Sequence, residues 1–344
     1  MVAMFHPRVK GSYYDMGYQY GTILYKHGFG VSEQTTEKLD FGRKCEKEVK
    51  RFFPEILKEI RGFADACHTS HKNLAALILS IGAFNDKPMC SAFATFNGSD
   101  VVFGRNYDFY YSLRKNTESY LTCPKEGYRS VGHSDIFVGR EDGVNEKGLA
   151  TAITGVREKI TKPGINFPLA VRFVLDKCAS VNEGVKALSD VHFSTTNNYL
   201  LADKDGNMAV VEASPQRVRV RRPEEDNSFT VCSNHFLHTE MLEMENQKER
   251  CWDSVPRYTT IYNALKQQDG KIDVKTAHKI LSNHSEYVCS HQKNIRLGTL
   301  WSVIATLKNL QIFRAEGHPC RVKYKPDTRL NKAIQMHQRQ LTPK

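Results

Sequence analysis

A cysteine at position 90 could act as a nucleophile because of what precedes it. Cys90 starts the strand-like run CSAFATF, and a flexible Asn-Asp-Lys-Pro-Met linker leads into it. Its thiol could attack the carbonyl of Met89, move that acyl group from nitrogen to sulfur and, after hydrolysis, release its own amine. A free α-amine titrates at about 7.7 to 8. The new amino terminus could therefore be the general base for the thiol of the same residue.

Taken alone, Cys90 would be interpreted as a small core residue, because free cysteines are most often buried and inert. The segments around it favour a different interpretation. A Gly-Arg-Asn-Tyr-Asp run at 104–108 follows on the next apolar stretch, and an Asp-Gly-Val-Asn-Glu-Lys-Gly-Leu-Ala run lies at 142–150. Their order and spacing carry more information than any one of them.

In that order and spacing the chain resembles the N-terminal-nucleophile cysteine hydrolases. This superfamily includes choloylglycine hydrolases, penicillin V acylases and acyl-coenzyme A:6-aminopenicillanic-acid acyltransferases. The resemblance spans almost the whole chain and rests on Cys90 and the segments 104–108, 142–150, 197–203, 211–215, 298–302 and 317–320. The stretch 11–21 is similar to the prosegment of the acyltransferase branch, whereas the bile-salt branch begins at or close to its nucleophile.

The resemblance implies roles for individual residues. Cys90 matches the nucleophile and the amino terminus that self-cleavage between Met89 and Cys90 would create. Arg105 and Asp108 match the pair that flanks the nucleophile in the family. A buried carboxylate near the new ammonium group would orient it and raise its pKa, and a nearby guanidinium would favour the thiolate.

The oxyanion hole is matched less completely. Asn198, or its neighbour Asn197, matches the side-chain amide donor, a kind of group worth about 3 kcal/mol in acyl transfer. Bile-salt and penicillin V hydrolases usually carry an Asn after the Gly-Leu-Ala strand, and the stretch 150–155 has none. They also carry an Arg late in the chain, where 298–302 reads Gly-Thr-Leu-Trp-Ser. Both absences argue against bile salts and leave the second oxyanion donor to a backbone N–H.

The elements that must position these residues change character near residue 86. Before it, the spacing of apolar and charged residues predicts three helices between residues 33 and 84, with Thr69 or Ser70 as N-cap of the last. After it, Asn97-Gly98, Asp142-Gly143 and Asp205-Gly206 are turn signals. Helical patterns occur at 168–190 and 252–268. Strands are predicted at 91–96, 101–107, 119–123, 136–139, 149–156, 198–203, 208–214, 217–222, 229–234, 299–307 and 310–315.

We therefore expect an α+β protein with the four-layer αββα N-terminal-nucleophile hydrolase fold. Residues 1–89 would form an α-helical prosegment and residues 90–344 the catalytic domain. The expected reaction passes an acyl group from a linear amide or acyl thioester, through a thioester on Cys90, to water or an amine. The partners would be this small-molecule donor, the acceptor and the cleaved prosegment, which should stay bound because its apolar helix faces would otherwise meet water.

Composition narrows the remaining possibilities. The net charge of +11 is spread along the chain, and we expect the basic run at 216–226 to be solvated and not to bind nucleic acid specifically. The nine cysteines are odd in number and scattered, which fits a reducing compartment. No stretch approaches the roughly 20 apolar residues of a membrane span, and the amino-terminal stretch lacks the pattern of a secretion signal. We expect a cytoplasmic protein without a membrane partner.

One further cluster could bind a metal ion, and two other classes of function are compatible with the sequence. His284, Cys289 and His291 are possible metal ligands, but no second cluster has zinc spacing, so we expect no metal and no cofactor. A catalytically silent binding protein would keep the fold and stay uncleaved. A basic nucleic-acid-associated protein on the same fold would bind random RNA with a steep salt dependence.

Overall fold

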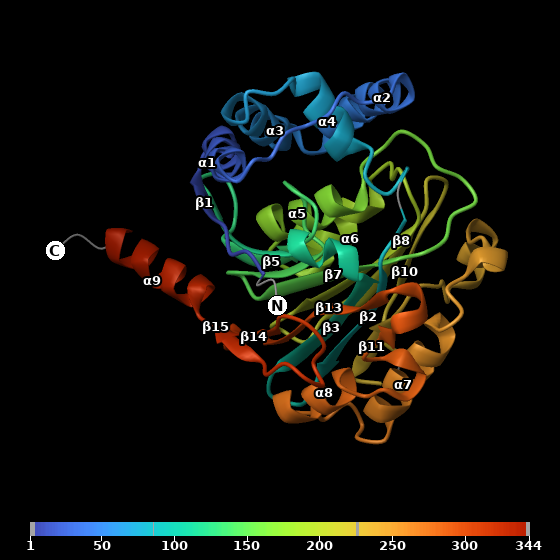
Figure 1. Ribbon diagram of the computed structural model, residues 1–344. Coiled ribbons are helices and arrows are strands. Elements are labelled where there is room, and N and C mark those ends of the chain that lie inside the picture. The colour runs from blue at the N-terminus through green and yellow to red at the C-terminus, as the bar shows by residue number, and fades with distance from the viewer. Residues whose placement is uncertain (1–3, 85, 225–226, 342–344) are drawn as a thin grey trace.

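Two β-sheets lie face to face in the computed structural model, and helices cover the outer side of each (Figure 1). The structure describes residues 4–84, 86–224 and 227–341. The first sheet has eight strands, in the order β1 (Arg8–Gly11), β4 (Glu118–Pro124), β5 (Ser130–Ser134), β6 (Asp142–Asn145), β7 (Leu149–Gly155), β8 (Asn197–Asp203), β9 (Met208–Ala213) and β10 (Val218–Arg221).

The second sheet holds the strand that starts near Cys90. Its order is β11 (Phe229–Cys232), β2 (Met89–Phe96), β3 (Val101–Tyr110), β13 (Leu297–Thr306), β14 (Gln311–Ala315) and β15 (Lys325–Asp327), and the short β12 (His291–Gln292) also pairs with β13. These pairings are antiparallel.

Helices complete the layers (Figure 1). The outer face of the first sheet is covered by α5 (Phe167–Lys177) and α6 (Val181–Ser189), and that of the second by α7 (Ser254–Lys266) and α8 (Val274–Leu281). A further layer lies over α5 and α6, formed by α1 (Tyr13–Lys26), α2 (Thr36–Phe52), α3 (Pro54–Ala66) and α4 (His71–Leu79). At the side of the molecule, α9 (Arg329–Leu341) extends away from the sheets. The predicted αββα arrangement is confirmed.

Strand side chains alternate between the cores of this layered structure. In β2, Cys90 and Ala92 belong to the cluster between the two sheets, and Phe93 belongs to the cluster under α7 and α8. In β7, Ala152 faces the same inter-sheet core and Ile153 faces the helices outside. Because successive residues of a strand point to opposite faces, the register of β2 directs Cys90 between the sheets.

The amino-terminal segment is joined to the rest by strand pairing and by buried charge. Strand β1 pairs in parallel with β4, so part of residues 1–89 belongs to the first sheet. Arg172 of α5 donates to Glu59 of α3 (Nη2 to Oε2, 2.9 Å), and both side chains are buried. Gly17 allows α1 to approach α3, because a Cβ there would lie 1.9 Å from the Glu59 carbonyl oxygen. Apolar residues of the four helices share one core with α5 and α6.

Local predictions for the helices largely hold. The three helices predicted between residues 33 and 84 are α2, α3 and α4, and Ser70 caps α4 by accepting a hydrogen bond from the backbone N–H of Asn73. The pattern at 168–190 forms two helices, α5 and α6. Among the described residues, none of the helices is long and apolar enough to cross a membrane.

Two predictions for the strands are wrong. Residues 136–139 are a series of bends and not a strand, and the Ser134 hydroxyl donates to the Ile136 carbonyl there. Asp142 and Gly143 lie within β6 and are not a turn. The chain turns after β6 at Gly148, whose φ of +81° favours glycine.

Candidate active site

Cys90 is held at its backbone and at its sulfur. It is the second residue of β2 and is fully buried. Its N–H donates to Asn234 Oδ1 (2.8 Å), and its carbonyl oxygen accepts a hydrogen bond from Arg257. Its Sγ lies 3.3 Å from Arg105 Nη2, which donates to it. Three polar side chains therefore converge on this one cysteine.

Arg105 spans the space between the two sheets. It lies on β3, opposite Ala92 of β2, and its side chain reaches the first sheet. There Nη1 donates to the carbonyl oxygens of Glu141 (3.0 Å) and Ile153 (2.7 Å), and Nε lies 3.0 Å from a carboxylate oxygen of Asp142. These contacts fix the guanidinium plane, so Nη2 is directed at the sulfur, where a cation favours the thiolate.

Opposing effects act on the Cys90 thiol. Burial is the largest, and it raises the pKa of Cys90 above the range of a free cysteine. The charges of Glu141 and Asp108 raise that pKa further, whereas Arg105 and Arg257 lower it. The thiol is therefore neutral in this structure. Of the two guanidinium groups, that of Arg105 contacts the sulfur and that of Arg257 contacts the Cys90 carbonyl oxygen.

Asp108 is a second buried ionisable group in this region. It lies on β3 opposite Met89, and its Oδ1 accepts a hydrogen bond from Thr299 Oγ1 (2.6 Å). Its Oδ2 is buried and has no partner in the described part of the chain. Burial raises the pKa of Asp108 to about 7, against the opposing charge of Arg257. An unpaired acceptor therefore lies close to the start of β2.

Asn234 is a site residue that sequence reasoning missed. It follows β11, the strand next to β2, so its side chain reaches the start of β2. Its Nδ2 donates to the carbonyl oxygens of Pro88 (3.1 Å) and Gly155 (2.7 Å), while its Oδ1 accepts the Cys90 N–H. One amide thus contacts the chain on both sides of the Met89–Cys90 peptide bond.

Arg257 was also missed. It lies on α7, is fully buried, and its Nη2 donates to Asn234 Oδ1 (2.8 Å) and to Asp253 (3.0 Å). The available signal was an arginine inside the apolar pattern at 252–268, which by itself does not differ from a structural ion pair. Its position supplies an arginine at Cys90. The prediction against bile salts is untested by this contact and stays a prediction.

The structure does not bring Asn198 or Asn197 to the Cys90 sulfur. Asn198 lies on β8, and its Nδ2 donates to the carbonyl oxygens of Ser233 (2.9 Å) and His235 (3.0 Å) and to Thr154. It therefore holds the backbone on both sides of Asn234. The Nδ2 of Asn197 donates to a neighbouring threonine hydroxyl.

The residues before Cys90 are anchored in the protein interior. Lys87 is buried, and its Nζ donates to the carbonyl oxygens of Val156 and Thr196 (2.9 Å each) and pairs with Glu158. Burial lowers the pKa of Lys87 to about 8. The chain that enters β2 is thus anchored to the segments that follow β7 and precede β8.

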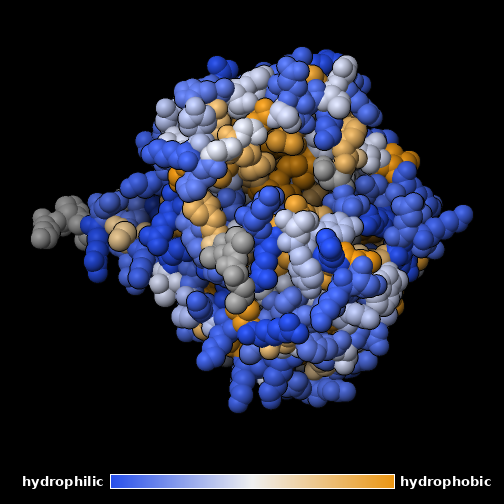
Figure 2. Space-filling model, viewed as in Figure 1, coloured by the Kyte–Doolittle hydropathy of each residue, from blue (hydrophilic) through white to orange (hydrophobic). Residues whose placement is uncertain are grey.

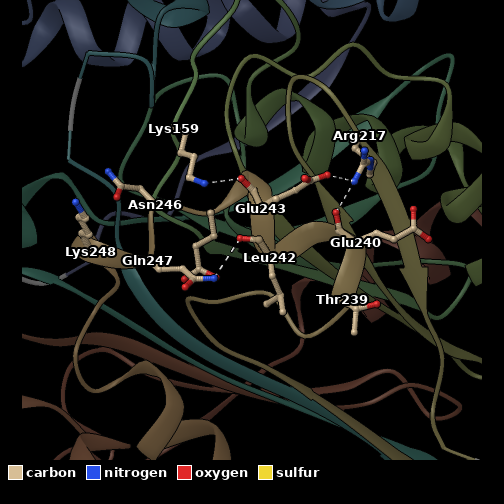
Figure 3. Close-up of a pocket in the computed structure, with 10 residues that line it drawn as sticks. Lys159, Arg217, Thr239, Glu240, Leu242, Glu243, Asn246, Gln247 and Lys248 are labelled. Atoms are coloured by element: carbon tan, nitrogen blue, oxygen red, sulfur yellow. Dashed lines mark hydrogen bonds and ion pairs between the residues drawn. The ribbon is translucent and has the colours of Figure 1, made fainter.

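A hollow on the surface is separate from this site. A pocket of about 810 Å³ is lined by Lys159, Arg217 and residues of the segment 239–248. In Figure 3, Lys159 and Arg217 both point toward Glu243. The lining contains neither a cysteine nor any of the residues that contact Cys90.

Figure 2 also shows apolar side chains gathered in a recess beneath the amino-terminal helices.

The family of the chain follows from its sequence. The family model of acyl-coenzyme A:6-aminopenicillanic acid acyl-transferase matches residues 95–320, well over half of the chain. The chain belongs to this family. Arg105, Asp108, Asn234 and Arg257 lie within the matched range, and Cys90 lies just before it. Membership in the acyl-transferase family supports acyl transfer or amide hydrolysis as the class of reaction.

Solved structures share the fold at low identity. A variant of the conjugated bile acid hydrolase from Clostridium perfringens matches with a TM-score of 0.52 and 16% identity over 71% of this chain and 93% of that one. A second variant of that enzyme gives 0.50 and 15% over 70% and 96%. The N-acylethanolamine-hydrolyzing acid amidase ortholog of Caenorhabditis elegans gives 0.48 and 16% over 64% and 93%.

The two matches to the bile acid hydrolase variants concern the N-terminal-nucleophile hydrolase fold, which this acyl-transferase family member shares. No curated protein matches the chain.

Proposed function

We propose that this protein is a self-cleaving enzyme whose Cys90 carries an acyl group as a thioester. The observation that carries the proposal is the convergence of Arg105, Asn234 and Arg257 on one buried cysteine. A cysteine that only fills space needs no such partners. Cys178, which is also buried, lies in the apolar cluster around α5 and α6.

Self-cleavage begins with attack of Cys90 Sγ on the carbonyl carbon of Met89. The C–N bond breaks, the thiol proton ends on the departing nitrogen, and the acyl group of Met89 is held on sulfur as a thioester. Water then cleaves the thioester, which leaves a carboxylate at Met89 and restores the thiol. Arg105, 3.3 Å from the sulfur, offsets the negative charge that the attack creates.

The released amine finds acceptors already in place. Asn234 Oδ1 accepts the Cys90 N–H before the cut and can accept a proton of the amine after it. The Oδ2 atom of Asp108, unpaired within the described residues, offers a second acceptor. In its protonated form the amine would favour the charged form of the Asp108 carboxylate. The two acceptors orient the amine as general base for Sγ.

The cut also frees an oxyanion donor, because the residues just before it can move away. Asn234 Nδ2 donates to the Pro88 carbonyl in the uncut chain. When the new carboxyl end at Met89 moves away, the Nδ2 hydrogen that contacted Pro88 can donate to the oxyanion of a substrate. We assign the donor role to Asn234 and not to Asn198, because one carbonyl that the Asn234 amide contacts, that of Pro88, lies before the cut, whereas both carbonyls that Asn198 contacts lie in the catalytic chain. When the residues that end at Met89 move away, they also expose the buried Cys90 thiol.

Each turnover then follows from these positions. The amine takes the thiol proton, and the sulfur attacks the acyl carbon of a linear amide or an acyl thioester. The ammonium group protonates the leaving amine or thiol, and the acyl group remains on Cys90. Water or an amine acceptor attacks that thioester and restores the thiol. The hydrolase and the transferase differ only in the acceptor.

The prosegment remains bound to the catalytic chain in this proposal. The buried pair of Arg172 and Glu59 and the pairing of β1 with β4 both join residues 1–89 to the remainder. Dissociation of residues 1–89 would leave the charge of Arg172 without its Glu59 partner in the interior. The cysteines of the chain are free, which supports a reducing, cytoplasmic location.

The basic run at 216–226 favours no nucleic-acid role. Three of its four arginines are paired with acids: Arg217 with Glu243, Arg219 with Glu240, and Arg221 with Glu212. Paired guanidinium groups are less available for phosphates.

Intact-mass spectrometry tests the acyl-carrier role. The matured protein is incubated with a panel of acyl amides and acyl thioesters, and the masses of both chains are measured. An acyl mass should appear on the catalytic chain, map to the peptide that begins with Cys90 and disappear with hydroxylamine, which cleaves thioesters.

Two variants control this experiment. Cys178→Ala, at a buried cysteine outside the site, should still be acylated, and Cys90→Ala should not. An acyl group carried by any other residue would contradict the proposal.

A further inference from the structure

Four side chains with metal-binding atoms meet in the second half of the chain: His284, Cys289, His291 and Cys320. Their ligand atoms all lie within 4.8 Å of one another. His291 Nε2 is 3.5 Å from Cys289 Sγ and 3.2 Å from Cys320 Sγ. A tetrahedral zinc ion with Zn–S and Zn–N bonds of about 2.3 and 2.0 Å separates its ligand atoms by about 3.3 to 3.8 Å. Both measured distances are close to this range.

The fold brings these residues together from separate segments. The connection from α8 to β13 carries His284, Cys289 and His291 in a tight loop, closed by a hydrogen bond from the Cys289 N–H to the Asn283 carbonyl (2.7 Å). Cys320 arrives from the turn that follows β14, 29 residues after His291. The sequence alone showed three possible ligands, and the structure adds the fourth.

The surroundings favour a ligand set over other uses of these groups. Cys289 is buried, and His284 is exposed, so the cluster extends from the interior to the surface, where an ion can enter. The nearest polar neighbour of the Cys289 sulfur along this loop is the imidazole of His291 and not a guanidinium group, as at Cys90. None of the four residues contacts the proposed nucleophile.

We propose that His284, Cys289, His291 and Cys320 form a structural zinc site of the Cys₂His₂ type. Two thiolates and two imidazoles in a tetrahedral arrangement are the ligands that zinc takes in structural sites, where four protein ligands leave no open position for substrate. The proposal does not depend on the acyl-transfer reaction.

The zinc site would stabilise the positions of two groups around Cys90. The N–H of Ser290, between two of the ligands, donates to Thr299 Oγ1 (3.0 Å), and that hydroxyl donates to Asp108 (2.6 Å). Gln292, next to His291, donates to Asp253 (2.9 Å), which in turn pairs with Arg257. An ion that ties this loop to the turn at Cys320 would therefore fix the loop that supports Asp108 and Arg257.

Metal content and a cobalt spectrum test the site. Protein with both parts of the chain present is purified under reducing conditions from cells grown in zinc-supplemented medium. Its zinc content is measured by inductively coupled plasma mass spectrometry. The expected result is about one zinc per chain. After exchange, Co²⁺ should give the intense visible bands of a tetrahedral site together with thiolate charge-transfer absorption.

Matched variants locate the ion. Cys320→Ser should lose the zinc and the cobalt bands, whereas Cys123→Ser, at a partly exposed cysteine outside the cluster, should keep both. A strong chelator should lower the Tm of the original protein and of Cys123→Ser, but not that of Cys320→Ser.

Three results would overturn the proposal. The first is protein that folds but contains no zinc and gives only the weak bands of octahedral Co²⁺. The second is zinc that Cys320→Ser retains in full. The third is a disulfide between Cys289 and Cys320 in protein isolated under reducing conditions, because a disulfide removes both thiolate ligands.

Discussion

Two buried cysteines of this chain differ in what surrounds their sulfur atoms. Cys90 lies in a regular strand and accepts a hydrogen bond from the guanidinium group of Arg105, whereas Cys289 lies in a loop beside the imidazole of His291. Burial raises the pKa of both thiols. A guanidinium group stabilises a thiolate without binding a metal, and an imidazole can share an ion with it. The neighbours, and not the burial, separate a proposed nucleophile from a proposed ligand.

Among replacements around Cys90, a replacement of Asp108 should have the largest effect on the rates of cleavage and turnover. Asp108→Asn keeps the shape but cannot carry the charge that orients the Cys90 amine. We expect a folded protein whose cleavage or turnover has a barrier raised by up to about 4 kcal/mol. Rates of chain cleavage on gels and of acyl release measure it. Turnover equal to that of the original protein would remove Asp108 from the mechanism.

Asparagine replacements distinguish the donor assigned from the structure from the one matched in the sequence. Asn234→Ala removes the amide that contacts both sides of the Met89–Cys90 bond, and should lower kcat by about 10²-fold to 10³-fold, or about 3 kcal/mol. Asn198→Ala removes only support for the turn around Asn234 and should cost less. The assignment would be reversed if Asn198→Ala proved the more damaging at equal thermal stability.

The pH dependence of stability should report the charge on Asp108 in the uncut chain. Its pKa is about 7 in the fold, against about 3.9 in an unfolded chain. A raised folded-state pKa contributes stability that is fully present below about pH 3.9 and is lost as the pH rises through about 7. In a Cys90→Ala background, the free energy of unfolding should therefore fall by about 3 kcal/mol more between pH 5 and 8 when Asp108 is present than when the chain also carries Asp108→Asn.

Urea unfolding of the two uncut proteins, at pH 5 and pH 8, measures this difference. The same pH dependence in both would show that Asp108 does not titrate in this range.

The proximity of Cys90, Arg105 and Asp108 could be predicted because these residues are close in the sequence. Arg105 and Asp108 lie on the strand that forms a hairpin with β2, so a short motif describes their geometry. Asn234 and Arg257 lie 144 and 167 residues from Cys90 and reach it only through the packing of β11 and α7 against β2. No local pattern separated Asn234 from Asn198, because each is an asparagine near one end of a strand: Asn198 is the second residue of β8, and Asn234 lies two residues after β11.

The layers were predictable from periodicity, and the local errors have a physical cause. Strand-like runs on both sides of the helical patterns at 168–190 and 252–268 predicted two stacked sheets with helices outside. The apolar run at 136–139 looks like a strand, but its bends let Phe137 pack on the amino-terminal helices, a contact that depends on tertiary structure. Cys320 was missed as a possible ligand for the same reason.

The cut between Met89 and Cys90 tests the central claim most directly. Because the reaction is intramolecular, its rate should not depend on protein concentration. Denatured protein should give chains of roughly 10 and 29 kDa, in proportion to residue number, and Edman sequencing should find a second sequence beginning Cys-Ser-Ala-Phe. Cys90→Ala should remain one chain. A cut at another bond, or a Cys90→Ala protein that is cleaved normally, would contradict the account.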